Sequence, residues 1–404
     1  MSAAAVIFVL ALGACAYVYL GYPLLLLVLA RLRPRPVRLE PVRPRMSVVV
    51  PAYDEGAVIA GKIRNTLENG YPRDLLEVIV ASDGSGDATV PIARDFDDGL
   101  VRVLDLPRGG KAAALNAAAH EATGEVLVFT DADVLLGPGA LGFMAENFAD
   151  PEVGGVAGRK VPGSCAAGHL ARGEDLYARF DEWQKGLESA FGSAVASHGA
   201  LHALRRELYV PVADPTGADD MAISMRVVLQ GRRLVYDPRA VAQVEAPDDG
   251  ATELERKVRI ANQVMRALFS LGTPLWTSGF YSVQLLSHKL LRYCIPIFLL
   301  LLLGSNIWLS LMTPGPAWDV LLVVQAAFYG AAAVGAASRK AMAGRSWLFT
   351  IPYYFCLVNA AALLALLSVL RGERAAGWSP RGGFNPDPNL EAAGVTHTSR
   401  SESS

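Results

Sequence analysis

The hydrophobic residues of this 404-residue chain are concentrated in long segments near its two ends. The first segment, residues 6–30, contains no charged residue, and about 20 apolar residues are enough to cross the hydrocarbon core of a membrane. Three segments of similar length follow later, at residues 294–312, 317–337 and 347–370. The pattern predicts one membrane span before a central polar region and about three spans, within residues 292–370, after it.

Arginine residues follow the first span directly. Residues 31–45 also contain several prolines, which predicts an extended linker rather than a helix. Because basic residues accumulate on the cytoplasmic side of a span, we expect a multi-pass protein of the cell membrane with its central region in the cytoplasm. A signal peptide is the alternative, but its apolar core would be about 7–15 residues long and would follow basic residues. The linker arginines are Arg31, Arg33, Arg35, Arg38, Arg43 and Arg45.

The segment at 272–291 mixes aromatic and basic residues with leucines, which is typical of a helix lying in the membrane interface. A buried amphipathic helix is the alternative. Four spans would place the arginines after residue 370 outside, against the usual charge bias. We therefore expect one segment to be re-entrant, and Pro352 and Asn359 point to the last one. The polar tail at 371–404 is expected to be disordered.

Residues 46–271 alternate short β-branched runs with helical stretches. We predict strands at 47–50, 78–81, 101–104 and 126–130, and helices at 58–69 and 112–121. This alternation predicts one α/β domain whose parallel strands are joined by crossover helices. Ligands of such sheets bind at the carboxyl ends of the strands.

Composition excludes several classes of protein. A hydrophobic content of 52% excludes intrinsic disorder, and a formal net charge of −2 gives no overall basic field for nucleic acid. The four cysteines lie far apart and without histidines at metal-ligand spacing. They therefore suggest neither a zinc site nor a disulfide framework.

Acidic residues follow the predicted strands. Asp54 and Glu55 come after the first strand, and Asp83 comes after the second in a Gly/Ser turn. By itself, Asp83 could equally be a turn or helix-cap residue. Lys111 follows two glycines at the start of a helix, which suits phosphate binding, although the spacing of a P-loop is missing.

Asp131 and Asp133 form a sharper motif after the fourth strand. Two carboxylates so close repel each other, and Mg²⁺ or Mn²⁺ completed by substrate phosphates would relieve that repulsion. A solvated turn is the alternative. A second pair, Asp219 and Asp220, opens a predicted helix, where acids also favour the helix dipole. Residues 256–259 form a basic cluster, which could bind lipid headgroups or form a solvated face.

The order of these motifs resembles that of the processive-type family 2 glycosyltransferases over residues 46–292. That family comprises inverting membrane enzymes such as hyaluronan, chitin, cellulose and poly-N-acetylglucosamine synthases. The resemblance implies an α/β fold with a GT-A-type nucleotide-sugar-binding domain between N-terminal and C-terminal transmembrane helices. It also implies that Asp131-Ala132-Asp133 is the family's Asp-x-Asp motif, with Asp133 at the metal and Asp131 beside it.

The resemblance assigns roles to the remaining candidates. Asp220 becomes the catalytic base beside Asp219. Arg256 and Arg259 fit the Gln/Arg-x-x-Arg-Trp motif, but Ile260 replaces the tryptophan associated with the acceptor sugar, which weakens the expectation of processive synthesis. A second register at residues 263–267 keeps the glutamine, Gln263, but also lacks the tryptophan, and the first register is preferred for its distance from Asp220. The residues that would hold or flank the nucleotide are Asp54, Glu55, Asp83, Lys111, Asp131 and Arg256.

The sequence thus predicts an inverting glycosyltransferase with a nucleotide-sugar donor, a UDP-sugar being expected, and a polysaccharide or lipid acceptor. Asp220 would take the acceptor proton, and a cation at Asp133 with Lys111 and Arg259 would stabilise the leaving diphosphate. Four spans could line a polymer channel only with a second copy or a partner subunit. A non-catalytic membrane protein that binds nucleotide is the alternative, but it would have no use for the base.

Overall fold

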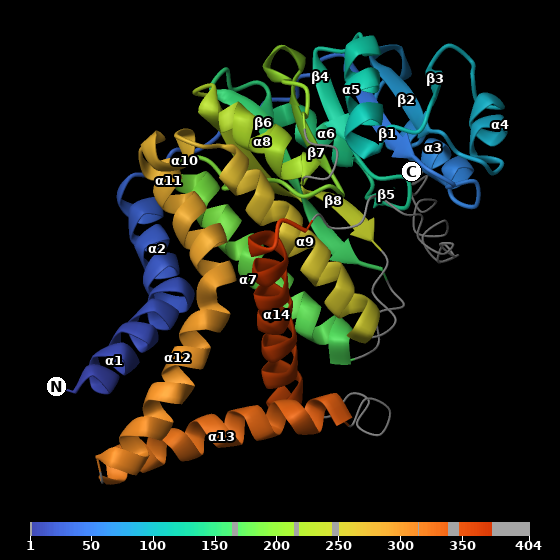
Figure 1. Ribbon diagram of the computed structural model, residues 1–404. Helices are drawn as coiled ribbons and strands as arrows, with labels where there is room; N and C mark the ends of the chain where they lie inside the picture. Colours follow the sequence, from blue (N-terminus) through green and yellow to red (C-terminus); the bar gives the residue numbers. More distant parts are fainter. Residues whose placement is uncertain are drawn as a thin grey trace, which may run out of the picture.

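A computed structural model describes residues 2–163, 169–213, 218–244, 250–313, 315–337 and 347–373. It consists of a sheet-containing domain joined at one end to a group of long apolar helices (Figure 1). The tail after residue 373, expected from the sequence to be disordered, lies outside the described residues.

Within the described residues the central domain contains an eight-stranded sheet of order β3-β2-β1-β4-β7-β6-β8-β5. The strands β3, β2, β1 and β4 are parallel, as predicted. The other half is mixed, because β7 runs antiparallel to both β4 and β6. The strands are β1 (Met46–Ala52), β2 (Leu76–Asp83), β3 (Val101–Leu106), β4 (Val126–Phe129), β5 (Leu135–Leu136), β6 (Val153–Pro162), β7 (His202–Arg205) and β8 (Arg233–Val244).

Helices cover both faces of the sheet, which explains why β1 is a continuous apolar run. Alternate residues of a strand point to opposite faces. Val48 of β1 packs with Ile59 of α3 on one face, while Val49 packs with Leu115 of α5 on the other. The longer helices of the domain are α3 (Ile59–Leu67), α4 (Thr89–Arg94), α5 (Lys111–Glu121), α6 (Ala140–Asn147), α7 (His169–Phe191), α8 (Asp219–Leu229) and α9 (Gly250–Ser270).

Among the described residues, four helices are long and apolar enough to cross a membrane. The first joins α1 (Ala3–Ala16) to α2 (Tyr22–Leu32) through a π-helical turn, η1 (Tyr17–Gly21). The second begins with α11 (Phe280–Gln284), continues through η4 (Leu285–Leu290) and ends with α12 (Leu291–Met312). The other two are α13 (Pro316–Ala337) and α14 (Trp347–Leu370).

The separate interfacial helix expected at 272–291 is not present as such. A short helix, α10 (Pro274–Thr277), ends before Gly279, whose positive φ of 61° starts the chain in a new direction. From Phe280 onward the helix is continuous with α12. Tyr281 and Leu285 are buried against Val195 of the domain, so this segment joins the domain to the span.

The apolar helices leave the domain and return to it (Figure 1). The end of α12 packs against the start of α1 through Leu309 and Phe8, far from the sheet. From there α13 runs across, and α14 leads back to the domain (Figure 1). At the end of α14, Ser368 Oγ accepts a hydrogen bond of 2.9 Å from Asn262 Nδ2 on α9. Both ends of the α12–α14 segment therefore lie on the domain side.

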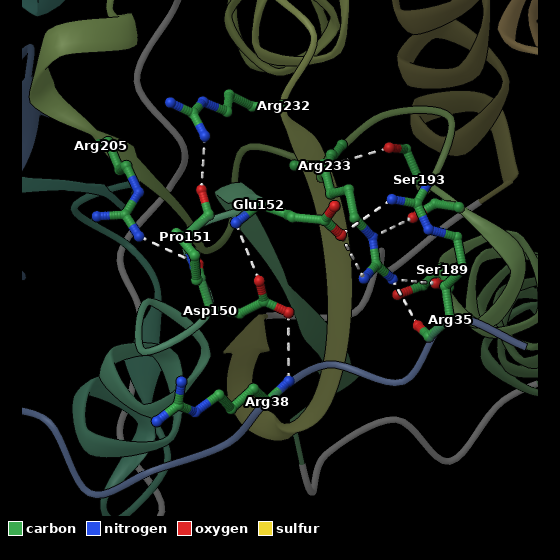
Figure 2. Close-up of polar contacts among 12 residues, drawn as sticks. Arg35, Arg38, Asp150, Pro151, Glu152, Ser189, Ser193, Arg205, Arg232 and Arg233 are labelled. Carbon is green, nitrogen blue, oxygen red and sulfur yellow. Dashed lines mark hydrogen bonds and ion pairs between the residues drawn. The ribbon is translucent and has the colours of Figure 1, made fainter.

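The basic linker is bound to the domain rather than free (Figure 2). Residues 34–45 form neither helix nor strand, in line with their prolines. The buried Arg233 side chain donates to the Arg35 carbonyl at 2.8 Å and to the Ser189 carbonyl at 3.1 Å. Arg38 N donates to Asp150 Oδ2 at 3.3 Å. These contacts fix the end of α2 relative to α7 and the sheet.

Candidate active site

The predicted acidic residues converge at the carboxyl end of β4. Lys111, at the start of α5, donates from Nζ to Asp131 Oδ1 at 2.6 Å and lies 3.4 Å from Asp219 Oδ2 on α8. Gly199 leaves little room beside them, since a Cβ there would lie 3.3 Å from Asp131 Oδ2 and 3.8 Å from Asp220 Oδ2. Residues from three distant parts of the sequence thus form one cluster.

Lys111 holds this cluster together electrostatically. Burial lowers the pKa of its ammonium group, but the nearby Asp131 and Asp219 carboxylates raise it by more, so the pKa lies above its ordinary value. Lys111 is therefore a permanent cation between the two acidic motifs.

Asp220 has the properties of a general base. Its Oδ1 accepts a hydrogen bond of 2.7 Å from the Met221 backbone N–H. Burial and the adjacent Asp219 raise the pKa of Asp220 from 3.8 to about 6, although Lys111 opposes the shift. A carboxylate of this pKa is ionised at neutral pH and is more basic than an ordinary aspartate.

The first acidic motif shapes the loops around the site. Asp54 adopts a left-handed backbone conformation, with φ of 53°, and its Oδ1 accepts from Gly86 N at 2.7 Å. Asp83 is only 1% exposed. Its carboxylate accepts from Gly109 N at 2.7 Å and Gly110 N at 2.9 Å, and also pairs with Arg108. Asp83 therefore positions the loop before Lys111.

The basic motif contributes two arginines, Arg256 and Arg259, to the surroundings of the site. Arg256 donates to Glu174 Oε1 at 2.6 Å and to Glu253 Oε2 at 2.8 Å, so it is bound to acids of α7 and α9. Arg259 and Ile260 line a cavity that Asp131 and Asp220 also line. Arg256 is thus held by two acidic residues while it lines the cavity beside Arg259.

Lys62 was not identified from the sequence, because one lysine on an amphipathic helix gives no signal. It is 1% exposed, and its Nζ donates to Thr130 Oγ1 at 2.8 Å and to the Val134 carbonyl at 2.7 Å. It therefore bridges both ends of the turn that carries Asp131 and Asp133. Burial lowers the pKa of Lys62 to about 7, although the two aspartates oppose the shift.

The site opens into a cavity of about 410 Å³ that extends to the apolar helices. Glu55, Lys111, Arg259 and both acidic pairs line this cavity. Tyr293 of α12 and Ala361 of α14 also line it. His198 borders the cavity, and neither of its ring nitrogens has a hydrogen-bond partner among the described residues.

The residues present fit a hard divalent cation. Carboxylate oxygens are ligands that Mg²⁺ and Mn²⁺ prefer. The described residues contain no group of three metal-ligating side chains. Asp133, which lines the cavity, and Asp131 would thus supply only part of the ligand sphere. That matches a cation completed by water and substrate phosphates.

Comparison with known proteins bears on the family and the fold. Residues 47–210 match the family model described as glycosyl transferase family 2. The mannosyltransferase PcManGT from Pyrobaculum calidifontis, solved in complex with GDP-Man and Mn²⁺, is 26% identical, with a TM-score of 0.65 over 91% of this chain and 100% of that chain. The family resemblance and the GT-A-type fold predicted from the sequence are confirmed.

Curated relatives are similar over shorter stretches. An N-acetylglucosaminyltransferase from Rhizobium sp. (strain N33) is 24% identical, covering 70% of this chain and 66% of its own length. A β-monoglucosyldiacylglycerol synthase from Trichormus variabilis is 28% identical, covering 52% of this chain and 47% of its own length. The probable glycosyltransferase YdaM of Bacillus subtilis is 28% identical over 51% of each chain. The chain therefore spans about half to two thirds of the length of these relatives.

Proposed function

We propose that the protein transfers a sugar, with inversion, from a nucleotide sugar to an acceptor at the membrane, because residues 47–210 match the model of glycosyl transferase family 2. One observation carries the proposal. Lys111 contacts Asp131 and Asp219, and all three line, together with Asp133 and Asp220, a cavity that residues of the apolar helices α12 and α14 also line. A water-soluble donor and a membrane-bound acceptor could therefore meet at Asp220.

The proposed reaction is a single displacement. The acceptor hydroxyl attacks the anomeric carbon and gives its proton to the Asp220 carboxylate, while the bond from that carbon to the diphosphate oxygen breaks. Asp219 sustains the basicity of Asp220 through like-charge repulsion. Lys111, a permanent cation, stabilises negative charge on the leaving diphosphate. A divalent cation held by Asp133 and Asp131 would add charge neutralisation at the same place.

We propose a UDP-sugar as the donor and Mg²⁺ or Mn²⁺ as the cation. The solved relative was crystallised with GDP-Man and Mn²⁺, which supports a nucleotide sugar and a divalent metal as classes. Relatives named N-acetylglucosaminyltransferase and β-monoglucosyldiacylglycerol synthase differ in their products, so the sugar stays open within this proposal.

For the acceptor we favour a lipid over a growing polysaccharide. Ile260 lines the cavity where the synthase motif would place a tryptophan, so the stacking surface for an acceptor sugar is missing there. The cavity also reaches α12 and α14 through Tyr293 and Val358, which suits a membrane-bound substrate. Transfer to long polysaccharide, in place of a glycolipid, would overturn this choice.

We further propose that the central domain is cytoplasmic and that α13 lies along the opposite face of the membrane. The α12 helix leaves the domain, α13 runs across its far end, and α14 returns (Figure 1). The chain would then cross three times, and the arginines from Arg371 onward would face the cytoplasm with those of the linker. A cysteine introduced at Ser404 should therefore react only with a membrane-permeant thiol reagent in intact cells. Labelling by an impermeant reagent would overturn this topology.

The activity is tested by measuring nucleoside diphosphate release from a panel of nucleotide sugars. Purified protein in detergent would receive lipid extract as acceptor, with Mn²⁺, Mg²⁺ or EDTA. We expect metal-dependent turnover of one donor and its loss in Asp220→Asn. Absence of turnover with every donor, combined with intact nucleotide binding, would favour a non-catalytic nucleotide-binding protein.

A further inference from the structure

Charged side chains of α7 and of the helical segment that leads into α12 line or border the cavity. On the wall between α7 and α12, Asp181 pairs with Lys185 at 2.9 Å and with Arg292 at 3.1 Å. His288 lies between Asp181 and the buried Glu188, at 3.0 and 2.8 Å. These two carboxylates are thus shared among several cationic or neutral donors.

Lys289 is the cation left over in this group. It lines the cavity, yet among the described residues its ammonium has no hydrogen bond and no carboxylate oxygen within 4.0 Å. Among the described residues, Asp181 pairs with Lys185 and Arg292, and Glu188 pairs with His288, so neither carboxylate forms an ion pair with Lys289.

A second group of charges lies between α7 and α9. Glu174 of α7 lies within 4 Å of Lys160, Arg256 and Lys257. Glu253 pairs with Arg256 and Lys257, and Glu182 pairs with Arg159. These carboxylates thus already have cationic partners among the described residues, and none of them pairs with Lys289.

Uncompensated charge inside a protein is costly, and buried charges are normally paired. A ligand anion would supply the missing partner. The bound diphosphate would lie beside Lys111 and Asp133. Lys289 shares the cavity with the proposed base, because Lys289, Lys185 and Asp220 all line it.

We propose that the acceptor is a phospholipid whose headgroup carries both a phosphate and a hydroxyl, with the phosphate bound by Lys289 and the hydroxyl presented to Asp220. Tyr293 of α12 and Val358 and Ala361 of α14 line the same cavity and would contact the lipid chains. This inference rests on the proposed function, because it names the acceptor for that same site.

The test compares three lipids in nanodiscs. Phosphatidylglycerol carries a phosphate and hydroxyls, phosphatidic acid carries only the phosphate, and diacylglycerol carries only a hydroxyl. Phosphatidylglycerol should be glycosylated with the highest kcat/KM, and phosphatidic acid should compete with it. Equal kcat/KM for diacylglycerol and phosphatidylglycerol, or no competition by phosphatidic acid, would overturn the proposal.

Variants of Lys289 assign the effect to this side chain. Lys289→Met should raise the KM for phosphatidylglycerol roughly tenfold or more, as expected for loss of one partner of a buried charge pair. The KM for the donor and transfer to diacylglycerol should stay unchanged, and Lys289→Arg should restore acceptor use. Arg31→Met, which removes an exposed charge from the end of α2, is the matched control for general attraction to anionic lipid. An unchanged acceptor KM in Lys289→Met, or an equal rise in Arg31→Met, would refute the assignment.

Binding of labelled phosphatidic acid to wild type and Lys289→Met, measured without donor, separates this inference from the proposed function. Lack of turnover with every donor would defeat the proposed activity, whereas unchanged lipid binding in Lys289→Met would defeat the phosphate site alone. Glycerol 3-phosphate should not displace the lipid at equal concentration. If it does, the site takes a soluble phosphate and the lipid assignment is wrong.

Discussion

Replacing Asp220 with asparagine should abolish transfer and at the same time stabilise the central domain at neutral pH. Burial and Asp219 raise the pKa of Asp220 from 3.8 to about 6. One pKa unit corresponds to about 1.4 kcal/mol, so the ionised carboxylate costs the native state about 3 kcal/mol. Asparagine has the same shape without the charge, and it removes that cost together with the base.

The sign of the pH dependence follows from proton linkage. Because the native state holds the Asp220 proton more tightly than the unfolded chain, the native state loses stability as the pH rises from about 4 to about 6. The gain in the free energy of unfolding caused by Asp220→Asn should therefore be about 3 kcal/mol at pH 7.5 and should fall to about 1 kcal/mol at pH 4.5. The transfer rate of the wild type should fall as the pH drops below about 6, since the base becomes protonated.

Thermal unfolding of the detergent-solubilised protein, followed by near-UV circular dichroism, measures this difference. The Tm of Asp220→Asn should exceed that of the wild type by roughly 5 °C or more at pH 7.5. Asp95→Asn, which neutralises an exposed carboxylate after α4, should leave both Tm and turnover unchanged. A Tm of Asp220→Asn at or below the wild-type value at pH 7.5, or retention of full turnover, would refute the reasoning.

Three further predictions concern the metal motif. Asp133→Ala should weaken Mn²⁺-dependent nucleotide binding by roughly tenfold or more, without changing binding in EDTA, as measured by calorimetry. Mn²⁺ binding, followed by electron paramagnetic resonance, should tighten between pH 6 and pH 8, because Lys62, with a pKa of about 7, loses its charge beneath Asp131 and Asp133. Lys62→Met should remove that pH dependence, and a persistent dependence would contradict the assignment. Gly199→Ala should lower kcat several-fold with the fold intact, since its Cβ would lie 3.3 Å from Asp131 Oδ2; an unchanged kcat would show that the cluster tolerates displacement.

The sequence alone predicted the features that depend on nearby residues. The apolar runs, the strands from β1 to β4 and the acidic motifs after them are visible because span length and strand pattern are local properties. The order of the motifs was enough to indicate the family, and parallel pairing implied that residues after these strands share one edge. The register of β1 with β2 and β4 brings Asp54, Asp83 and Asp131 to that edge.

Only the tertiary structure decided which distant residues meet. The antiparallel insertion of β7 and the return of α14 to α9 depend on packing between elements far apart in the chain. Lys62 beneath the metal motif was not visible as a functional candidate, because a single lysine on a helix has no local signature. Lys289 was visible only as one of the basic residues of a predicted interfacial segment and not as a residue of the cavity. Their significance comes from burial and from the charges around them, which are set by contacts across the whole fold and not by neighbours in sequence.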